Sequence, residues 1–479
     1  MTTHRRLWSC FAILIATASF FPRAVLSHPT DEPVIALYYP DWKIYNKQYI
    51  TPSQLPADKI THIIYAFLAV CGPVTASPDN VQRLMAQQCQ NKPTGTAILF
   101  DGFAATQKQL PGHTSKQVNY LGNFGQLKYL TEQHPSLNVL ASFGGWTLSE
   151  PFHTVIQDKK TQYVFARSVR QLLEKYDFFT GIQIDWEYPG GHGLAGIGLD
   201  RREEEKHGFT QLLQAVKREL TGLEKHTQRR YELSAAINAS PKFSGSIDWP
   251  QVAPLLDHVF LMSYDYLGNW TNTVGHHSNL FATPTTPSGL SVSGQVQSLQ
   301  QQGLSNDQII VGAPFYGRGW QGVNAFSPEH LEGLDSAGGI NKGSNLNEPG
   351  YFTYHDIAKH FLAKKQLGFA YYYDQQAEAA VLYNPKLKEY ISFDDARSIK
   401  AKADYVREQQ LGGVFAWEAT ADYQDQLLDA IRAGLYPIPE TQTSPSAAPF
   451  LQTSRIPASE NGQQNTPSNV PQTNENSVN

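Results

Sequence analysis

Residues Phe178–Pro189 read FFTGIQIDWEYP, a short β-rich run whose second half carries two acidic residues. Alternate side chains of a strand share one face, so Gln183, Asp185 and Glu187 are predicted to point the same way, about 6 to 7 Å apart along the chain. Burying an unpaired charge costs several kcal/mol, so two carboxylates and an amide on one inward face indicate a functional role.

Short β-rich apolar runs recur along the chain, with amphipathic helical stretches between them. This alternation is typical of a parallel sheet wrapped by helices, and eight such units predict an α/β fold, a (β/α)8 TIM barrel. Catalytic groups of such barrels lie at the carboxyl ends of the strands, and Asp185 and Glu187 are predicted to lie there. The alternative is that these residues form a polar network that closes the top of the barrel and has no catalytic role. The predicted strands are Val34–Tyr39, Ile60–Leu68, Val139–Phe143, Gly181–Glu187, Tyr231–Asn238, His258–Tyr264, Ile309–Pro314 and Gly413–Trp417.

The interval between the seventh and eighth strands is too long for one helix. Strand-like runs at Gly368–Tyr373 and Tyr390–Phe393 predict a small α+β insertion there, at residues 321–393. Asp394 and Asp395 directly precede a helical stretch that starts at Ala396, and we predict that they cap this helix.

The two ends of the chain differ in composition from the predicted barrel domain, residues 28–437. Residues 1–27 combine a basic start, the mostly apolar run Leu7–Phe21 and small residues for cleavage, which is typical of a secretory signal. That run is shorter than the ~20 residues of a membrane span. Residues 438–479 are rich in Pro, Ser, Thr, Gln and Asn and predict a disordered tail. We therefore expect a secreted, extracellular protein with no membrane contact after signal cleavage.

The overall composition argues against several classes of partner. With a formal net charge of -5 and 17% charged residues, the chain offers no basic face for nucleic acid. Aromatic residues make up 12%, which suits stacking on sugar rings, although most of them are expected in the core. The histidines do not cluster at ligand spacing, so no metal is expected. Cys71 and Cys89 remain after signal removal; one disulfide and two free thiols are equally compatible with their spacing.

The segment Phe178–Pro189 resembles the signature of glycoside hydrolase family 18, Asp-Gly-x-Asp-x-Asp-Trp-Glu at the end of the fourth strand. The likeness covers nearly the whole chain after the signal, from about Pro33 to Pro437, and is closest to bacterial chitinases of the chitinase A type. Several other motifs agree in the same order. They are SFGGW at Ser142–Trp146, MSYDY at Met262–Tyr266, YGRGW at Tyr316–Trp320, and Trp417-Glu418.

This resemblance implies a chitinase that hydrolyses β-1,4 bonds between N-acetylglucosamine units of chitin or chito-oligosaccharides by a retaining, substrate-assisted mechanism. It implies that Glu187 protonates the departing oxygen, that Asp185 binds the acetamido N–H and that Tyr264 holds the acetamido carbonyl. A monomer that needs no cofactor is expected. The residues implied for substrate binding are Gln183, Trp146, Met262, Asp265, Tyr266, Arg318 and Trp417, with Trp417 under the attacked sugar and Trp146 under the sugar on the leaving side.

Two positions depart from the family signature, because Thr180 and Gln183 stand where it has acids. Gln183 cannot share a proton with Asp185. We predict that it donates an N–H to that carboxylate and lowers its pKa, which would reduce activity or move its pH optimum. Two other functions stay open: a chitin-binding lectin that has lost catalysis, and an endo-β-N-acetylglucosaminidase that acts on N-glycans. The retained Glu187 argues against the first, and the insertion argues against the second.

Overall fold

The computed structural model describes residues 32–46, 50–191, 193–196, 199–271, 273–324, 326 and 348–437. The described residues form one compact unit that ends at Pro437. The predicted signal, residues 1–27, and the predicted tail, residues 438–479, lie outside the described residues. Among the helices of the described part, none has the length and apolar character needed to cross a membrane.

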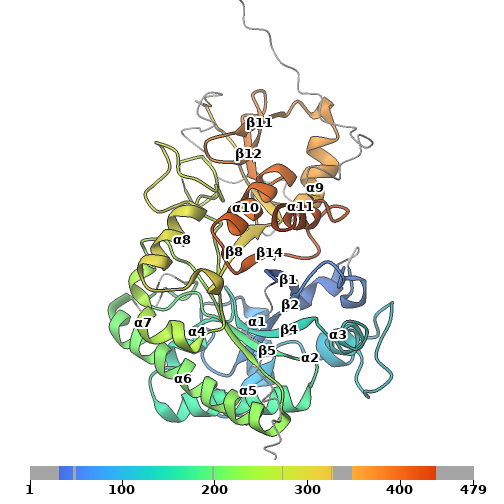
Figure 1. Cartoon of the computed structure of the whole chain (residues 1–479), viewed down its shortest axis with the longest axis vertical. Coiled ribbons are helices and arrows are strands. Elements are labelled where there is room, and N and C mark those ends of the chain that lie inside the picture. Colours follow the sequence, from blue (N-terminus) through green and yellow to red (C-terminus); the bar gives the residue numbers. More distant parts are fainter. Residues whose placement is uncertain are drawn as a thin grey trace, which may run out of the picture. The chain divides into compact units, whose positions relative to one another are not determined.

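Eight parallel strands close into a barrel, because β1 pairs with both β14 and β2 (Figure 1). A short antiparallel strand, β3 (Ala97–Leu99), extends the sheet beside the last residues of β2. The predicted (β/α)8 TIM barrel is confirmed, with each predicted strand present and some strand ends displaced by a few residues. The barrel strands are β1 (Val34–Pro40), β2 (His62–Val70), β4 (Asn138–Gly144), β5 (Gly181–Asp185), β6 (Glu232–Ile237), β7 (His258–Leu261), β8 (Ile309–Pro314) and β14 (Gly413–Trp417).

Side chains of the barrel strands alternate between two apolar clusters, as strand geometry requires. In β1 the even-numbered apolar residues belong to the cluster that fills the barrel, and the odd-numbered ones pack beneath the helices. In β5, Ile182 and Ile184 belong to the cluster beneath the helices. Gln183 and Asp185, which alternate with them, therefore face the barrel interior.

Helices cover the outside of the barrel with their apolar faces. The longest, α6 (Arg202–Thr227), buries the apolar residues from Phe209 to Leu220 that recur at helical spacing in the sequence. The other α-helices are α1 (Asp79–Gln88), α2 (Gly102–Thr106), α3 (Gly122–Gln133), α4 (Glu150–Val155), α5 (Lys159–Lys175), α7 (Trp249–Val252), α8 (Val292–Gln301), α9 (Tyr354–Asp356), α10 (Ala396–Glu408) and α11 (Gln426–Leu435).

The start of α10 confirms one predicted cap and corrects the other. Asp395 is the N-cap residue, and its Oδ1 accepts the backbone N–H groups of Arg397 and Ser398. Asp394 does not cap the helix. Its buried carboxylate instead forms an ion pair with Lys402, at 2.5 Å, because the amino group on α10 reaches inward to it.

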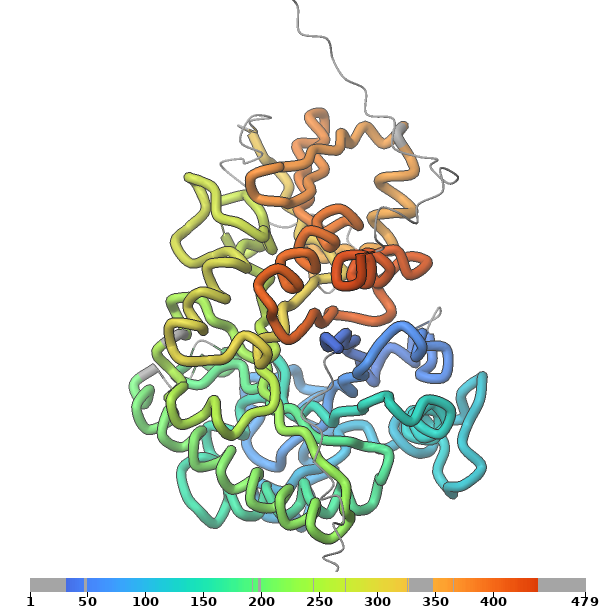
Figure 2. The backbone as a smooth tube through the Cα atoms, viewed as in Figure 1, coloured from blue at the N-terminus to red at the C-terminus, as the bar shows by residue number. Residues whose placement is uncertain are grey.

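A second sheet of five antiparallel strands lies between β8 and β14 in the sequence (Figure 2, yellow to red-orange). Two of its strands, β11 and β13, contain the predicted runs near residues 370 and 390. The sheet also includes β9, so the insertion begins before the predicted range 321–393. Only Phe315 separates β9 from the barrel strand β8. In order across the sheet, the strands are β10 (Tyr351–Thr353), β9 (Tyr316–Trp320), β13 (Glu389–Phe393), β12 (Ala379–Asn384) and β11 (Ala370–Asp374).

Cys71 and Cys89 form a disulfide, so the alternative of two free thiols is wrong. Cys71 directly follows β2, and Cys89 is the C-cap residue of α1. The bridge therefore fastens the end of α1 to the carboxyl end of a barrel strand.

Candidate active site

The carboxyl end of β5 carries the predicted acidic pair. Asp185 is buried and is the last residue of the strand, whereas Glu187 is partly exposed in the connection that follows. The predicted strand extended to Glu187. It ends earlier because the Glu187 backbone N–H donates to the Ser149 hydroxyl oxygen, at 2.9 Å, instead of continuing the ladder. Ser149 itself donates towards the carbonyl oxygens of Gly145 and Asp185, at 2.8 and 3.0 Å, so one side chain holds both neighbouring strand ends.

Gln183 does not hydrogen-bond to Asp185 as predicted. Its carbonyl oxygen accepts the hydroxyl groups of Tyr38, at 2.5 Å, and Ser142, at 3.0 Å. Its amide nitrogen and Asp185 Oδ1 both lack a hydrogen-bond partner among the described residues. The predicted lowering of the pKa of Asp185 is wrong: burial, and then the charge of Glu187, raise that pKa well above its usual value.

Glu187 has the electrostatics of a general acid. Burial raises the pKa of its carboxyl to about 7; a hydrogen bond from Tyr188 opposes this rise and the negative charge of Asp265 adds to it. A carboxyl with this pKa holds its proton for about half of the time at neutral pH and can therefore donate it. Together, Asp185 and Glu187 place two carboxyls with raised pKa values at the mouth of the barrel.

The loop after β4 depends on two glycines that lie against this pair. Gly144 has φ +115°, and a Cβ there would lie 2.0 Å from the Asp185 carbonyl oxygen. Gly145 has φ +76°, and a Cβ there would lie 2.4 Å from the ring of Phe67. Only glycine combines these backbone angles with so close an approach. Trp146, the next residue, is 48% exposed and lines a small cavity together with Glu187.

Aromatic rings gather at the carboxyl end of β14. The ring of Trp417 is stacked with Phe67 at 5.8 Å between centroids, and it contacts Tyr38 at 5.3 Å and Trp42 at 6.4 Å. Trp42 is 43% exposed, so this group of rings reaches the surface, and its member Tyr38 lies close to the acidic pair. Sequence analysis found Trp417 but missed Tyr38, Trp42 and Phe67, because the first and last lie in ordinary apolar strand runs and Trp42 belongs to no motif.

A charged pair, Asp265 and Arg318, lies near the acidic residues. The Arg318 guanidinium on β9 donates to both carboxylate oxygens of Asp265, each at 2.8 Å, and also pairs with Glu348. Burial alone would raise the pKa of Asp265, but Arg318, with a contribution from His277, lowers it well below its usual range. Asp265 is therefore a permanent anion within electrostatic reach of Glu187.

Tyr264 lies within reach of the same carboxyls. Burial raises the pKa of its hydroxyl well above the usual value, and the charges of Asp185, Asp265 and Glu187 raise it further. Met262 is buried in the apolar cluster inside the barrel, next to Tyr264 in the sequence motif. The positions of Tyr264 and Met262 are compatible with the predicted role of both residues in lining the site.

Two residues of the motifs have other partners. The Tyr266 hydroxyl donates to Gln295 on α8, at 3.4 Å, and the side chain is buried. Thr180 precedes β5, where its hydroxyl oxygen accepts the backbone N–H of Val139 at 3.0 Å. The hydroxyl of Tyr266 thus belongs to the packing of a helix on the barrel, and Thr180 to the pairing of β4 with β5.

The described residues show one group whose side chains could together hold a metal ion: His62, Glu232 and His258. It lies at the amino ends of the barrel strands, opposite Asp185 and Glu187, because all three residues are the first of their strands. Asp185 and Glu187 can themselves supply proton transfer and electrostatic stabilisation.

The order of these motifs around the barrel agrees with a known family. Residues 34–422 match the family described as glycosyl hydrolases family 18. The chain belongs to this family. Among family 18 relatives, "Chitinase" of Autographa californica nuclear polyhedrosis virus is 33% identical over 418 residues, 85% of this chain and 73% of that protein. "Chitinase A" of Pseudoalteromonas piscicida is 32% identical over 432 residues, 84% of this chain and 52% of that protein.

A solved chitinase structure agrees with the fold. The chitinase ChiA74 from Bacillus thuringiensis superposes with a TM-score of 0.74 at 30% identity, covering 84% of this chain and 70% of that one. The chain thus spans about half to three quarters of the length of these proteins.

A buried pair of side chains that sequence analysis missed, Glu205 and His153, holds the loop that follows the family 18 signature. Glu205 on α6 is fully buried; it accepts the Gly190 backbone N–H at 2.7 Å and lies 2.6 Å from His153 Nδ1. The pair holds the connection that carries Glu187. No local pattern could have found it, because Glu205 on α6, His153 on α4 and the loop residue Gly190 meet only in the folded chain.

Proposed function

We propose that this family 18 chain is a chitinase that hydrolyses β-1,4 bonds between N-acetylglucosamine units of chitin or chito-oligosaccharides. One observation carries the proposal: the partly exposed carboxyl of Glu187, with a pKa raised to about 7, follows the buried carboxyl of Asp185 at the barrel mouth. A general acid is most effective when its pKa lies near the operating pH. The names of the relatives support the substrate class.

In the proposed reaction the substrate supplies its own nucleophile. The acetamido oxygen attacks the anomeric carbon of the same sugar while Glu187 gives its proton to the glycosidic oxygen, which leaves as a hydroxyl. The Glu187 carboxylate then takes a proton from water as the water oxygen bonds to the anomeric carbon and opens the oxazolinium ring. Two inversions at one carbon retain its configuration, and Glu187 ends protonated as it began.

Asp185 and Tyr264 are proposed to hold the acetamido group in line. Asp185 Oδ1 has no hydrogen-bond partner among the described residues, so it is free to accept the acetamido N–H. The raised pKa of Tyr264, due first to burial, keeps its hydroxyl protonated and able to donate to the acetamido oxygen. Groups fixed in this way before the substrate binds lower the entropy cost of reaching the transition state.

The aromatic surfaces on either side are proposed as sugar-binding sites. Trp417, backed by Phe67, would lie under the attacked sugar, and the exposed ring of Trp146 under the sugar on the leaving side. Asp265 and Arg318 are proposed to line the groove between them as hydrogen-bonding groups. Met262 would add apolar contact. Gln183 would contribute by holding the side chains of Tyr38 and Ser142 in place within the barrel, next to Asp185.

Product analysis on a defined chitohexaose tests the proposal. We expect shorter oligosaccharides with a retained β anomer, and a loss of about 10²- to 10⁴-fold in kcat for Glu187→Gln. Glu174→Gln, a carboxyl on the outer helix α5 paired with Arg170, is the matched control and should keep its activity. Binding of chitohexaose without cleavage by the wild type would indicate the lectin instead. Release of intact N-glycans, with chitohexaose uncut, would indicate the endo-β-N-acetylglucosaminidase.

The proposed location is extracellular. The Cys71–Cys89 disulfide supports it, since such bonds persist in oxidising compartments. Residues 1–27 are proposed as a cleaved signal, 28–437 as the catalytic barrel with its insertion, and 438–479 as a tail outside the barrel domain. Amino-terminal sequencing of the protein from culture medium checks the first of these assignments, and light scattering checks the proposed monomer.

A further inference from the structure

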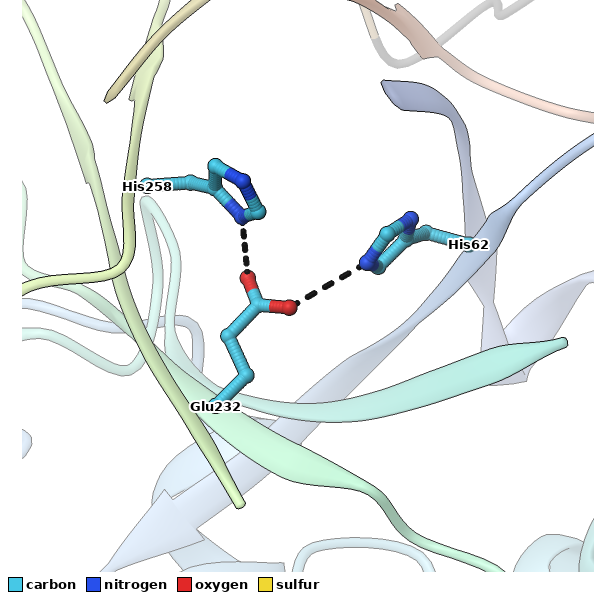
Figure 3. Close-up of side chains that lie close together, drawn as sticks. All are labelled: His62, Glu232 and His258. Atoms are coloured by element: carbon cyan, nitrogen blue, oxygen red, sulfur yellow. Dashed lines mark hydrogen bonds and ion pairs between the residues drawn. The ribbon is translucent and has the colours of Figure 1, made fainter. Parts of the chain in front are cut away.

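Three side chains converge at the amino end of the barrel, opposite the candidate active site. His62, Glu232 and His258 are the first residues of β2, β6 and β7. Each offers one nitrogen or oxygen atom that could bind a metal, and these three atoms lie within 4.8 Å of one another. Figure 3 shows the Glu232 carboxylate between the two imidazole rings. None of these residues takes part in the proposed hydrolysis.

The geometry of the three side chains suits metal coordination. Glu232 Oε2 lies 3.1 Å from His62 Nε2, and Oε1 lies 2.9 Å from His258 Nδ1. The two rings are perpendicular, at an interplanar angle of 90°, and each turns one nitrogen towards the same carboxylate (Figure 3). Two imidazole nitrogens and one carboxylate form a set that binds zinc with water in the fourth position.

Neighbouring side chains, those of Thr61 and Ser234, orient the three candidate ligands. Thr61 Oγ1 lies 2.7 Å from His62 Nδ1 and 3.2 Å from the Ile35 carbonyl oxygen. When His62 Nδ1–H donates to Thr61 and Thr61 donates to Ile35, the lone pair of His62 Nε2 faces the Glu232 carboxylate, and a cation between them relieves the repulsion. Ser234 donates its hydroxyl to Glu232 Oε1. Metal-binding histidines and carboxylates have outer partners of this kind.

The cluster itself offers a cation one negative charge, that of the Glu232 carboxylate. Among the described residues, no lysine or arginine forms an ion pair with Glu232, whose two partners are the histidines. The neighbouring carboxylate of Asp257 is already paired with Lys217, at 3.3 Å, and Arg230, at 2.5 Å. The side chains of Glu232 and His258 are 12% and 15% exposed, so an ion can enter from solvent.

We propose that His62, Glu232 and His258 form a binding site for a divalent transition-metal ion of the zinc class. The ligands are His62 Nε2, His258 Nδ1 and the Glu232 carboxylate, and water completes the coordination. Binding releases any proton that the two nitrogens hold. In the sheet, β2 neighbours neither β6 nor β7, so the ion links strands across the floor of the barrel. Its role is structural, and the inference does not depend on the proposed hydrolysis.

Metal binding to the whole chain tests this site directly. The purified protein is stripped with a chelator, dialysed against Zn²⁺, and its bound metal is measured by mass spectrometry. We expect one zinc ion per chain, and Co²⁺ in its place should show the visible bands of imidazole coordination. Mg²⁺ and Ca²⁺ should not compete, because they prefer ligand sets made of oxygen alone. The midpoint of unfolding should rise with free zinc concentration.

Conservative variants locate the bound ion. His62→Gln and His258→Gln each keep a side-chain N–H for Glu232, and each should lower zinc affinity by at least about tenfold. His276→Gln is the matched control, because His276 is also buried and lies 3.0 Å from a single carboxylate, Asp374. The control should keep its zinc, and kcat on chitohexaose should stay unchanged in all three.

Two results would overturn the proposal: no stoichiometric zinc in the wild type, or zinc retained at full affinity by both ligand variants. If a variant fails to fold, X-ray absorption on the wild type decides the question. It should show nitrogen and oxygen ligands at about 2.0–2.2 Å with two imidazoles, and a shell of oxygen alone would refute the site.

Discussion

Replacing Tyr188 by Phe should move the alkaline limb of the activity profile to higher pH. The Tyr188 hydroxyl hydrogen-bonds to the Glu187 carboxyl and opposes the rise in pKa that burial causes there. The Tyr188 ring packs against Phe243 at 4.3 Å between centroids. Phe at position 188 keeps this packing and removes only the donor.

The size of the effect follows from the energy of one hydrogen bond to a charged group, about 1.5–3 kcal/mol. One pKa unit corresponds to about 1.36 kcal/mol, so the lower figure raises the pKa of Glu187 from about 7 by about one unit. The acid acts in its protonated form, so activity is full below this pKa and falls about tenfold per pH unit above it. At pH 8, the protonated fraction of Glu187 rises from about a tenth to about a half, a gain of roughly fivefold relative to each enzyme's own plateau.

The assay is kcat/KM on a fluorogenic chitobioside across the range from about pH 5 to pH 10. Tyr373→Phe is the matched control, since that hydroxyl also donates to a carboxylate, Glu378, at 2.6 Å on the second sheet. Its profile should coincide with that of the wild type. An alkaline limb that stays in place or moves to lower pH in Tyr188→Phe would refute the assignment of Glu187 as the titrating acid.

Three further substitutions test the surroundings of the site and the core. Gly144→Ala should remove most activity, because its Cβ would lie 2.0 Å from the Asp185 carbonyl oxygen; wild-type kcat with an unchanged circular dichroism spectrum would contradict this. Gln183→Asp adds a like charge beside Asp185 and should raise the pKa of Asp185 further, which a pH profile on a soluble chito-oligosaccharide measures; a profile identical to that of the wild type would rule the coupling out. Lys402→Met leaves Asp394 buried without its cation and should lower the free energy of unfolding by about 3–5 kcal/mol, measured with urea; a loss below about 1 kcal/mol would show that the pair is not needed.

The barrel could be predicted because its evidence is local. Each strand is a short apolar run bounded by turns, and the closure of eight such runs follows from their number and their alternation with helices. The inward direction of Asp185 also follows from strand geometry alone. Glu187 lies beyond the end of the strand, and its position depends on Ser149, a contact between segments that no periodicity encodes.

The parts that sequence reasoning missed depend on contacts across the barrel. The acceptor role of Gln183 follows from Tyr38 and Ser142, which belong to two other strands. The cluster of His62, Glu232 and His258 is equally hidden, because ligand spacing along the chain cannot reveal residues that only barrel closure brings together. A pKa, likewise, depends on burial and on charges from several segments, so its direction at Asp185 could not be read from the motif.

The short passage from β8 into β9 has a consequence for anyone who shortens or transplants this protein. Arg318, the counter-ion of Asp265, belongs to β9, and β9 is held by β10 and β13 on either side. A minimal barrel obtained by excising the second sheet would leave Arg318 without its supporting strands. Asp265 would then lose the ion pair that neutralises its charge. A graft of this module onto another scaffold would have to begin at Tyr316, directly at the barrel, and carry its neighbours with it.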